Sequence, residues 1–156
     1  MSPIRLGVIG LSARGWAAAG LIPPLFDPVL SDKYTITAVA TRSESSARAS
    51  AAKYSELTGH DVKGYYGEHG ATDIANDPDV DLVVVSVKVP DHYKVAKPAI
   101  EAGKDIFLEW SPTRNLSEIL ELAEAPKKKG IRTIVGAQSN QGATTRTVSQ
   151  ANMLDN

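Results

Sequence analysis

An apolar segment that runs directly into a glycine-containing turn is the feature that most constrains the fold of this chain. Ile4–Ile9 has the composition of a buried strand, and Gly10-Leu11-Ser12-Ala13-Arg14-Gly15 separates it from a predicted helix start at Trp16. A strand, a tight glycine turn and a helix in this order form a cradle for the pyrophosphate of a dinucleotide. The same order also occurs in plain strand–turn–helix units that hold no ligand, so both interpretations stay open at this point.

The glycine fingerprint of such loops, G-x-G-x-x-G, reads Gly10-x-Ser12-x-x-Gly15 in this chain. We expect Gly10 to allow the tight turn, position 12 to let the backbone approach the phosphates, and Gly15 to let the helix pack close to the strand. The helix N-terminus is expected to present free N–H groups and a positive dipole end to the anion. Ser12 departs from the fingerprint because it adds a Cβ and a hydroxyl. Arg14 either reaches a phosphate or points into water.

Strand-like and helix-like segments alternate along the chain, which predicts a parallel sheet with helices on both faces. The expected strands are Ile4–Ile9, Tyr34–Ala40, Val62–Tyr66, Leu82–Val87, Ile106–Glu109 and Ile131–Ala137. The expected helices are Trp16–Leu21, Glu44–Thr58 with Ser43 and Gly59 as caps, Ala71–Asn76, Pro90–Ala102, and Leu116–Ala125 with Asn115 as N-cap. We therefore predict a single α/β domain of the Rossmann type, with a doubly wound, mostly parallel sheet.

The C-terminal third contains two features that affect these boundaries. Pro126 interrupts a segment that otherwise predicts a helix up to Gly130. A proline inside a helix costs about 3 kcal/mol, so we expect a break or kink there. After Ala137 the chain becomes polar, with few large apolar residues. We predict a dinucleotide-binding domain over residues 1–137 and a polar helix or tail over residues 138–156.

Composition limits the partners, the compartment and the metal chemistry. The formal net charge is −1, so no electrostatic footprint favours nucleic acid or an anionic membrane. The chain has no cysteine, which excludes disulfides and thiolate ligands and is typical of a reducing compartment. It shows no signal-peptide pattern and no apolar run that spans a bilayer, so we expect a cytoplasmic protein, with the nucleus as the alternative. Its three histidines lie in separate segments, which predicts no metal site.

The residues after the second expected strand indicate which dinucleotide fits. An acidic side chain there holds the ribose 2′-hydroxyl of NAD, whereas an arginine accommodates a 2′-phosphate. This chain has Thr41, Arg42 and Ser43, and its first carboxylate comes at Glu44. The guanidinium fork of Arg42 and the two hydroxyls favour NADP(H), with NAD(H) as the alternative. The other interpretation is a surface arginine beside a serine that only caps the next helix.

Several segments together resemble the N-terminal domain of the Gfo/Idh/MocA oxidoreductase family. They are Ile4–Gly15, the spacing from His92 to Glu101-Ala102-Gly103-Lys104, the following Ile106-Phe107-Leu108-Glu109, and Gly130 before the last strand. The resemblance covers about residues 3–137. Within the family the chain is most similar to the fungal galactose-repressor-like branch, through Gly10-Leu11, Gly15-Trp16, His92-Tyr93 and Glu109-Trp110. The resemblance implies a Rossmann fold, a nicotinamide cofactor, and a second domain that supplies a substrate wall.

The resemblance also identifies candidate catalytic residues, and it does so through departures from the family pattern. The family carries Glu-Lys-Pro after its fifth strand, with the lysine as a catalytic cation, where this chain has Glu109, Trp110, Ser111 and Pro112. Tryptophan is neither an acid near neutral pH nor a charged group. Lys88, in the segment that replaces the family's Thr-Pro-Asn, is therefore the candidate substitute cation, unless it faces solvent.

Three further side chains are assigned to the site by the same resemblance. His92 matches a family position at the rim of the nicotinamide pocket, and its alternative role is a hydrogen bond to loop backbone. Glu109 and Trp110 are expected to contact the cofactor. Trp110 either stacks on the nicotinamide or lines an apolar pocket, and its alternative role is packing in the interior. We expect Trp16 to lie near the same cleft mouth.

Three functions follow, and whether the chain is an enzyme stays open. The first is an NADP(H)-binding oxidoreductase-like domain that lacks the family lysine and second domain and acts on an unknown small molecule. The second is a non-catalytic regulator that senses a dinucleotide or binds a protein. The third is a repurposed isomerase, dehydratase or cyclase, and a truncated gene product without function is the remaining alternative. We also expect self-association or a protein partner, because the strand ends near Trp110 and Pro112 are left open.

Overall fold

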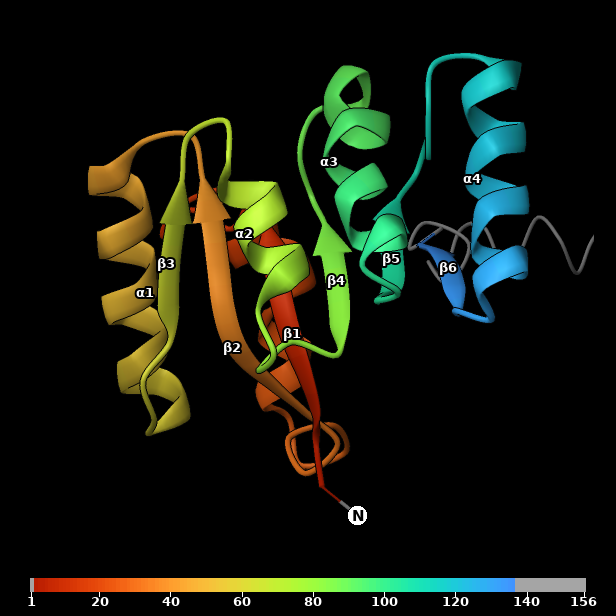
Figure 1. The fold of residues 1–156 in the computed structure, drawn as a ribbon. Helices are drawn as coiled ribbons and strands as arrows, with labels where there is room; N and C mark the ends of the chain where they lie inside the picture. Colours follow the sequence, from red (N-terminus) through yellow and green to blue (C-terminus); the bar gives the residue numbers. More distant parts are fainter. Residues whose placement is uncertain (1, 137–156) are drawn as a thin grey trace, which may run out of the picture.

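A computed structural model describes residues 2–136 and shows a six-stranded sheet (Figure 1). All neighbouring strands in it pair in parallel, in the order β3-β2-β1-β4-β5-β6. The strands are β1 Ile4–Ile9, β2 Tyr34–Thr41, β3 Lys63–Tyr66, β4 Leu82–Val85, β5 Asp105–Glu109 and β6 Thr133–Gly136. The predicted Rossmann-type α/β fold is confirmed. The predicted tail over 138–156 lies outside the described residues.

Four α-helices connect most of these strands in the described part of the chain. They are α1 Glu44–Thr58, α2 Gly70–Asn76, α3 Val89–Glu101 and α4 Leu116–Lys129. The connection from β1 to β2 differs from the prediction, because it holds a five-residue π-helical turn, η1 Ala17–Leu21, followed by a 3₁₀ turn, η2 Pro23–Phe26. The N–H of Ile22 donates to the carbonyl of Ala17, and Pro23 and Pro24 then have no N–H with which to extend the helix.

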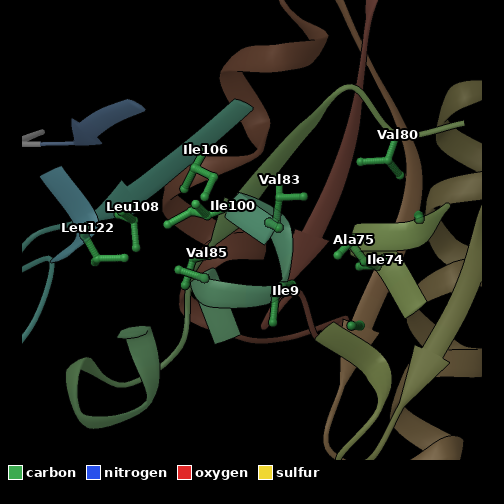
Figure 2. Packing of buried hydrophobic residues seen from close by; sticks show 14 residues of the cluster. Ile9, Ile74, Ala75, Val80, Val83, Val85, Ile100, Ile106, Leu108 and Leu122 are labelled. Carbon is green, nitrogen blue, oxygen red and sulfur yellow. The ribbon is translucent and has the colours of Figure 1, made fainter. Parts of the chain in front are cut away.

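The sheet buries apolar side chains on both faces, as the prediction of a doubly wound sheet requires. On the face covered by α2, α3 and α4, buried side chains include Ile9, Ile74, Val83, Val85, Ile100, Ile106 and Leu108 (Figure 2). The other face, under η1, η2 and α1, buries Leu6, Val8, Leu11, Ile22, Ile36, Val39 and Tyr54. Alternate residues of β4 serve opposite faces, and burying each such valine stabilises the fold by about 1.5–3 kcal/mol.

The predicted helix caps are present. The Ser43 side chain accepts a hydrogen bond from the Ser46 N–H at the start of α1, and Gly59 ends that helix in the left-handed conformation. The Asn115 side chain accepts from the Glu118 N–H at the start of α4. These side chains satisfy N–H groups that have no partner inside the helix, so the sequence fixes where the two helices begin.

The break expected at Pro126 is not observed, because α4 continues to Lys129. Pro126 lies in the last turn, so its missing N–H removes a single hydrogen bond of the helix. Its ring is buried, and its carbonyl accepts from the N–H groups of Gly130 and Ile131. The apolar contact and the closing hydrogen bonds offset the cost of the proline at this position.

A network of charged side chains ties the turn between α2 and β4 to the amino ends of the strands. The Lys63 ammonium lies 2.8 Å from carboxylate oxygens of both Asp77 and Asp79. Arg5 donates to both carboxylate oxygens of Asp81, at 3.0 and 2.8 Å. Burial by itself raises the pKa of Asp77, but hydrogen bonds from Lys63 and from backbone outweigh it, so the pKa lies below its ordinary value. The hydrogen bond from Arg5 lowers the pKa of Asp81 to about 2.

These lowered pKa values predict a loss of stability in acid. A carboxylate with a lowered pKa in the folded state stabilises the fold above its ordinary value of 3.8, and the contribution is lost as pH falls toward about 2. Urea unfolding midpoints measured between pH 5 and pH 2 should fall steeply for the wild type. Asp81→Asn should be less stable at pH 7 and lose less over that range, whereas the exposed Asp61→Asn should follow the wild type. Equal acid sensitivity of Asp81→Asn and the wild type would contradict this account.

Candidate functional site

The predicted site residues gather where the strands end at their carboxyl termini. Gly10 follows β1, Arg42 follows β2, Lys88 lies in the loop after β4, and Glu109 ends β5. In the order β3-β2-β1-β4-β5-β6, the connections reverse direction between β1 and β4. Ligands of open α/β sheets bind outside the carboxyl ends of the strands at this switch point.

Gly10 has the tight-turn role predicted for it. Its φ is +95°, and a Cβ at this position would lie 1.9 Å from the carbonyl oxygen of Ser86. Its N–H donates to the Ala40 carbonyl at 2.8 Å, and the Ser86 N–H donates to Ile9 at 2.9 Å. The backbones after β1 and β4 therefore touch, and no side chain fits between them.

Gly15 has a different role from the one predicted. A Cβ there would lie 2.5 Å from the Ser12 hydroxyl oxygen, and within 4 Å it would otherwise meet only the Ser12 Cβ. Gly15 thus makes room for the side chain of Ser12 rather than for a neighbouring strand. The helix dipole expected behind the loop is also small, because η1 has five residues and few aligned peptide groups.

Two side chains of α1 hold the carbonyl groups of this loop. The buried Ser50 hydroxyl donates to the Leu11 carbonyl at 2.6 Å, and the Lys53 ammonium donates to the Ala13 carbonyl at 2.9 Å. Within residues 2–136, the N–H groups of Ala13 and Arg14 donate to no backbone carbonyl. The loop therefore fixes its carbonyl oxygens against α1 and keeps N–H donors available for an anion.

Ser50 and Lys53 were not among the predicted site residues. They lie three positions apart and therefore on one face of α1, which is the only signal the sequence offers. That signal does not say which loop the face contacts.

Of Thr41, Arg42 and Ser43 at the carboxyl end of β2, Arg42 has the side chain free to meet a ligand. The Thr41 hydroxyl donates to the Ser43 carbonyl at 3.1 Å, and the Ser43 hydroxyl caps α1. The nearest carboxylate, Glu44, forms an ion pair with Arg48. Arg42 is exposed and forms no ion pair within the described residues.

Glu109 joins three parts of the site. Its carboxylate is buried and accepts hydrogen bonds from the Trp16 indole N–H at 2.7 Å and from the Ser86 hydroxyl at 2.6 Å. These contacts connect the end of β5 to the loop after β1 and to the end of β4. The role of Ser86 was not predicted, because the three residues are far apart in the sequence.

The side chain of Trp110 is exposed to 69 %, so the packed-interior alternative is wrong. Lys88 is exposed at the N-cap of α3, as its solvent-facing alternative describes. Both side chains stand at the carboxyl end of the sheet, on the loops after β5 and β4.

His92 is buried, with 1 % of its surface exposed, and its place at the rim of the nicotinamide pocket stays a prediction. Its ring nitrogens lie 2.8 Å from the Ser111 carbonyl and 3.0 Å from the Val87 carbonyl. A neutral imidazole has a single N–H and can donate to only one of them at a time. The alternative role, bonding to loop backbone, is confirmed: the ring holds the loops after β4 and β5 together.

A cavity of about 180 Å³ lies elsewhere, at the amino end of β2. It is lined by Leu25, Phe26, Ser31, Tyr34, Thr35, Ile36, Leu57 and Thr58. These residues include no carboxylate, histidine or lysine, and the cavity lies at the opposite end of the strands from the predicted site residues. The described residues hold no cluster of three metal-ligating side chains, and none of their helices has the length and apolarity to cross a membrane.

Comparison with known proteins agrees with this geometry. Residues 4–137 match the model of the Gfo/Idh/MocA family, described as an oxidoreductase family with an NAD-binding Rossmann fold. Dehydrogenase aclE of Aspergillus oryzae is 42 % identical over 135 residues, which cover 85 % of this chain and 35 % of that protein. The galactose/lactose metabolism regulatory protein GAL80 of Saccharomyces cerevisiae is 28 % identical over 149 residues, covering 90 % and 32 %.

A solved structure gives the same fold. The WlbA dehydrogenase of Chromobacterium violaceum, in complex with NADH and UDP-GlcNAcA, superposes with a TM-score of 0.76 at 21 % identity, over 99 % of this chain and 41 % of that one. This chain thus spans about a third of the length of the two curated relatives above. On the family match and the identity to aclE, the chain belongs to the Gfo/Idh/MocA oxidoreductase family and carries its NAD(P)-binding Rossmann domain.

Proposed function

We propose that this domain binds NADP(H) in preference to NAD(H), with Arg42 as the partner of the 2′-phosphate. The observation that carries the proposal is the exposed, unpaired guanidinium of Arg42 at the end of β2, in a place where Glu44 is already paired with Arg48. A guanidinium fork binds a phosphate through two parallel hydrogen bonds.

The residues present fit a dinucleotide along the carboxyl edge of the sheet. The N–H groups of Ala13 and Arg14 are suited to bind the pyrophosphate. The close backbone contact at Gly10 holds the loop against the end of β4, so a dinucleotide can approach the loop backbone. When bound, the nicotinamide supplies hydride chemistry. The exposed rings of Trp16 and Trp110 offer apolar surfaces for a flat heterocycle, and Glu109 holds Trp16 in place.

The preference for NADP(H) is tested by removing the guanidinium. Arg42→Ala should weaken binding of NADP⁺ by about 1–3 kcal/mol, the scale of a hydrogen bond to a charged group, and leave binding of NAD⁺ nearly unchanged. Isothermal titration calorimetry gives both dissociation constants. The matched control is Arg48→Ala, which removes an arginine of α1 that is already paired. Equal losses for the two dinucleotides, or no binding of either by the wild type, would contradict the proposal.

We propose further that this chain does not carry out the lysine-dependent dehydrogenation of its family. Oxidising a carbinol to a carbonyl transfers a hydride to the cofactor and requires a group that takes up the hydroxyl proton. The family lysine is replaced by Trp110, and His92 is buried between two carbonyls. Lys88, in the loop after β4, is the remaining candidate for the catalytic cation, and its side chain is exposed.

Turnover assays separate these possibilities. Loss of one positioned acid or base costs about 10²–10⁴-fold, so NADP⁺ reduction by the wild type with sugars, polyols and hydroxy acids should be near background. Trp110→Lys should raise it, and Lys88→Ala should change nothing. Strong wild-type turnover that Lys88→Ala abolishes would identify Lys88 as the catalytic cation. Turnover of a substrate without any cofactor would favour the repurposed isomerase, dehydratase or cyclase instead.

A second candidate function, a regulator that binds a protein or a second copy of itself, is favoured by the exposure of two tryptophans. Trp16 is exposed to 66 % and Trp110 to 69 %, at the end of the sheet where Glu109 links their segments. Exposed apolar surface of this kind marks contact sites in proteins, and a galactose regulatory protein is among the relatives.

Association through this surface is measurable by light scattering at micromolar concentration. The wild type should exceed the mass of a monomer or co-elute with a partner, and Trp110→Ser should reduce the association. Leu57→Ser, which changes an exposed apolar side chain on α1, is the matched control. A wild type that remains monomeric and captures no partner counts against this function.

A further inference from the structure

We propose that Lys53, which contacts the glycine loop, supplies positive charge for the pyrophosphate of the dinucleotide. This inference rests on the proposed binding of a dinucleotide at the loop. Lys53 is assigned to the pyrophosphate and Arg42 to the 2′-phosphate, so the roles of the two side chains are testable independently.

The short turn that follows the glycine loop leaves a bound pyrophosphate with little electrostatic support from a helix. In glycine loops of this kind, aligned peptide dipoles of a following helix favour the anion. Here the following helix is the five-residue turn η1, and Ser12 fills the space at Gly15. The electrostatic support that a long helix provides is therefore weak, and another group has to supply it.

Lys53 contacts the glycine loop directly. Its ammonium lies 2.9 Å from the carbonyl oxygen of Ala13, inside the loop, and the side chain is partly buried. Ser50, one turn earlier on α1, holds the Leu11 carbonyl in the same way. An ammonium has three N–H donors, and the Ala13 carbonyl accepts from one of them, which leaves two for other acceptors.

The positive charge of Lys53 differs in its partners from that of two other lysines. Lys63 is paired with Asp77 and Asp79, and Lys97 with Glu121. Lys53, in contrast, forms no ion pair with a carboxylate in residues 2–136; its ammonium donates to the neutral carbonyl of Ala13 and lies 5.3 Å from the centroid of the Tyr54 ring. Its charge is thus not cancelled by a partner, and it adds to that of Arg14 in the same loop.

A purely mechanical role would also explain the contact with Ala13, so the test has to separate charge from support. Lys53→Met keeps the length of the side chain and removes the ammonium. Lys53→Arg keeps the charge. Lys128→Met removes an exposed lysine of α4 and is the matched control. Thermal unfolding of each variant of the whole 156-residue chain identifies any variant that does not fold. If Lys53→Met does not fold, the comparison of Lys53→Arg and Ser50→Ala with the wild type takes its place.

Two small probes report on the two phosphate positions. ADP-ribose contains the pyrophosphate and lacks the 2′-phosphate, and adenosine 2′-monophosphate has the opposite pattern. By calorimetry, Lys53→Met should weaken ADP-ribose about ten- to hundredfold, the range of a charge-assisted hydrogen bond, and leave adenosine 2′-monophosphate unchanged. Lys53→Arg and Lys128→Met should stay within about threefold of the wild type on that scale. The salt dependence of ADP-ribose binding should be less steep in Lys53→Met.

Three results would overturn the proposed role of Lys53 or the proposed function. Binding of ADP-ribose by Lys53→Met as tightly as by the wild type overturns the proposal. An equal loss in Lys53→Met and Lys53→Arg, with unchanged salt dependence, also overturns it, because the side chain would then act only as a support. A wild type that binds neither probe nor NADP⁺ overturns the proposed function itself, and Lys53 loses its role with it.

Discussion

The contact between the backbone at Gly10 and the carbonyl of Ser86 is the constraint on which the site depends. It holds the chain leaving β1 against the chain leaving β4, at the point where the connections reverse. Because a Cβ at position 10 would overlap this carbonyl, the loop after β1 can reach its position only with glycine there. Two hydrogen bonds of the site depend on where this contact holds the two backbones. The Ser50 hydroxyl donates to the carbonyl of Leu11, which follows Gly10, and the Ser86 hydroxyl donates to the Glu109 carboxylate.

The fold was predictable because its signals are local. The apolar run that ends in Val85 is buried on both faces, and such runs are typical of central parallel strands. Ser43, Gly59 and Asn115 mark helix ends through chemistry that involves their near neighbours only. The predicted helix end at Ala125 was wrong because the effect of Pro126 depends on the burial of its ring and on its place in the last turn, which a local pattern does not contain.

The site was predictable only where the sequence pattern itself carries a steric requirement, as at Gly10. The hydrogen bonds of Glu109 join residues 93 and 23 positions away, and the hydroxyl of Ser50 meets a carbonyl 39 positions away. Composition and spacing do not encode such pairs. His92 shows the same limit, since its position was recognised but its burial between two loop carbonyls depends on how both loops fold.

The placement of the tryptophans gives the protein a built-in optical probe. The chain has two tryptophans, and both are exposed at the carboxyl end of the sheet. The indole N–H of Trp16 also donates a hydrogen bond to the Glu109 carboxylate. Indole emission responds to nearby charge and to solvent, so the tryptophan fluorescence of this protein originates at one end of the sheet. The tyrosines do not contribute when tryptophan is excited selectively, so events at that end of the sheet are observable without any label.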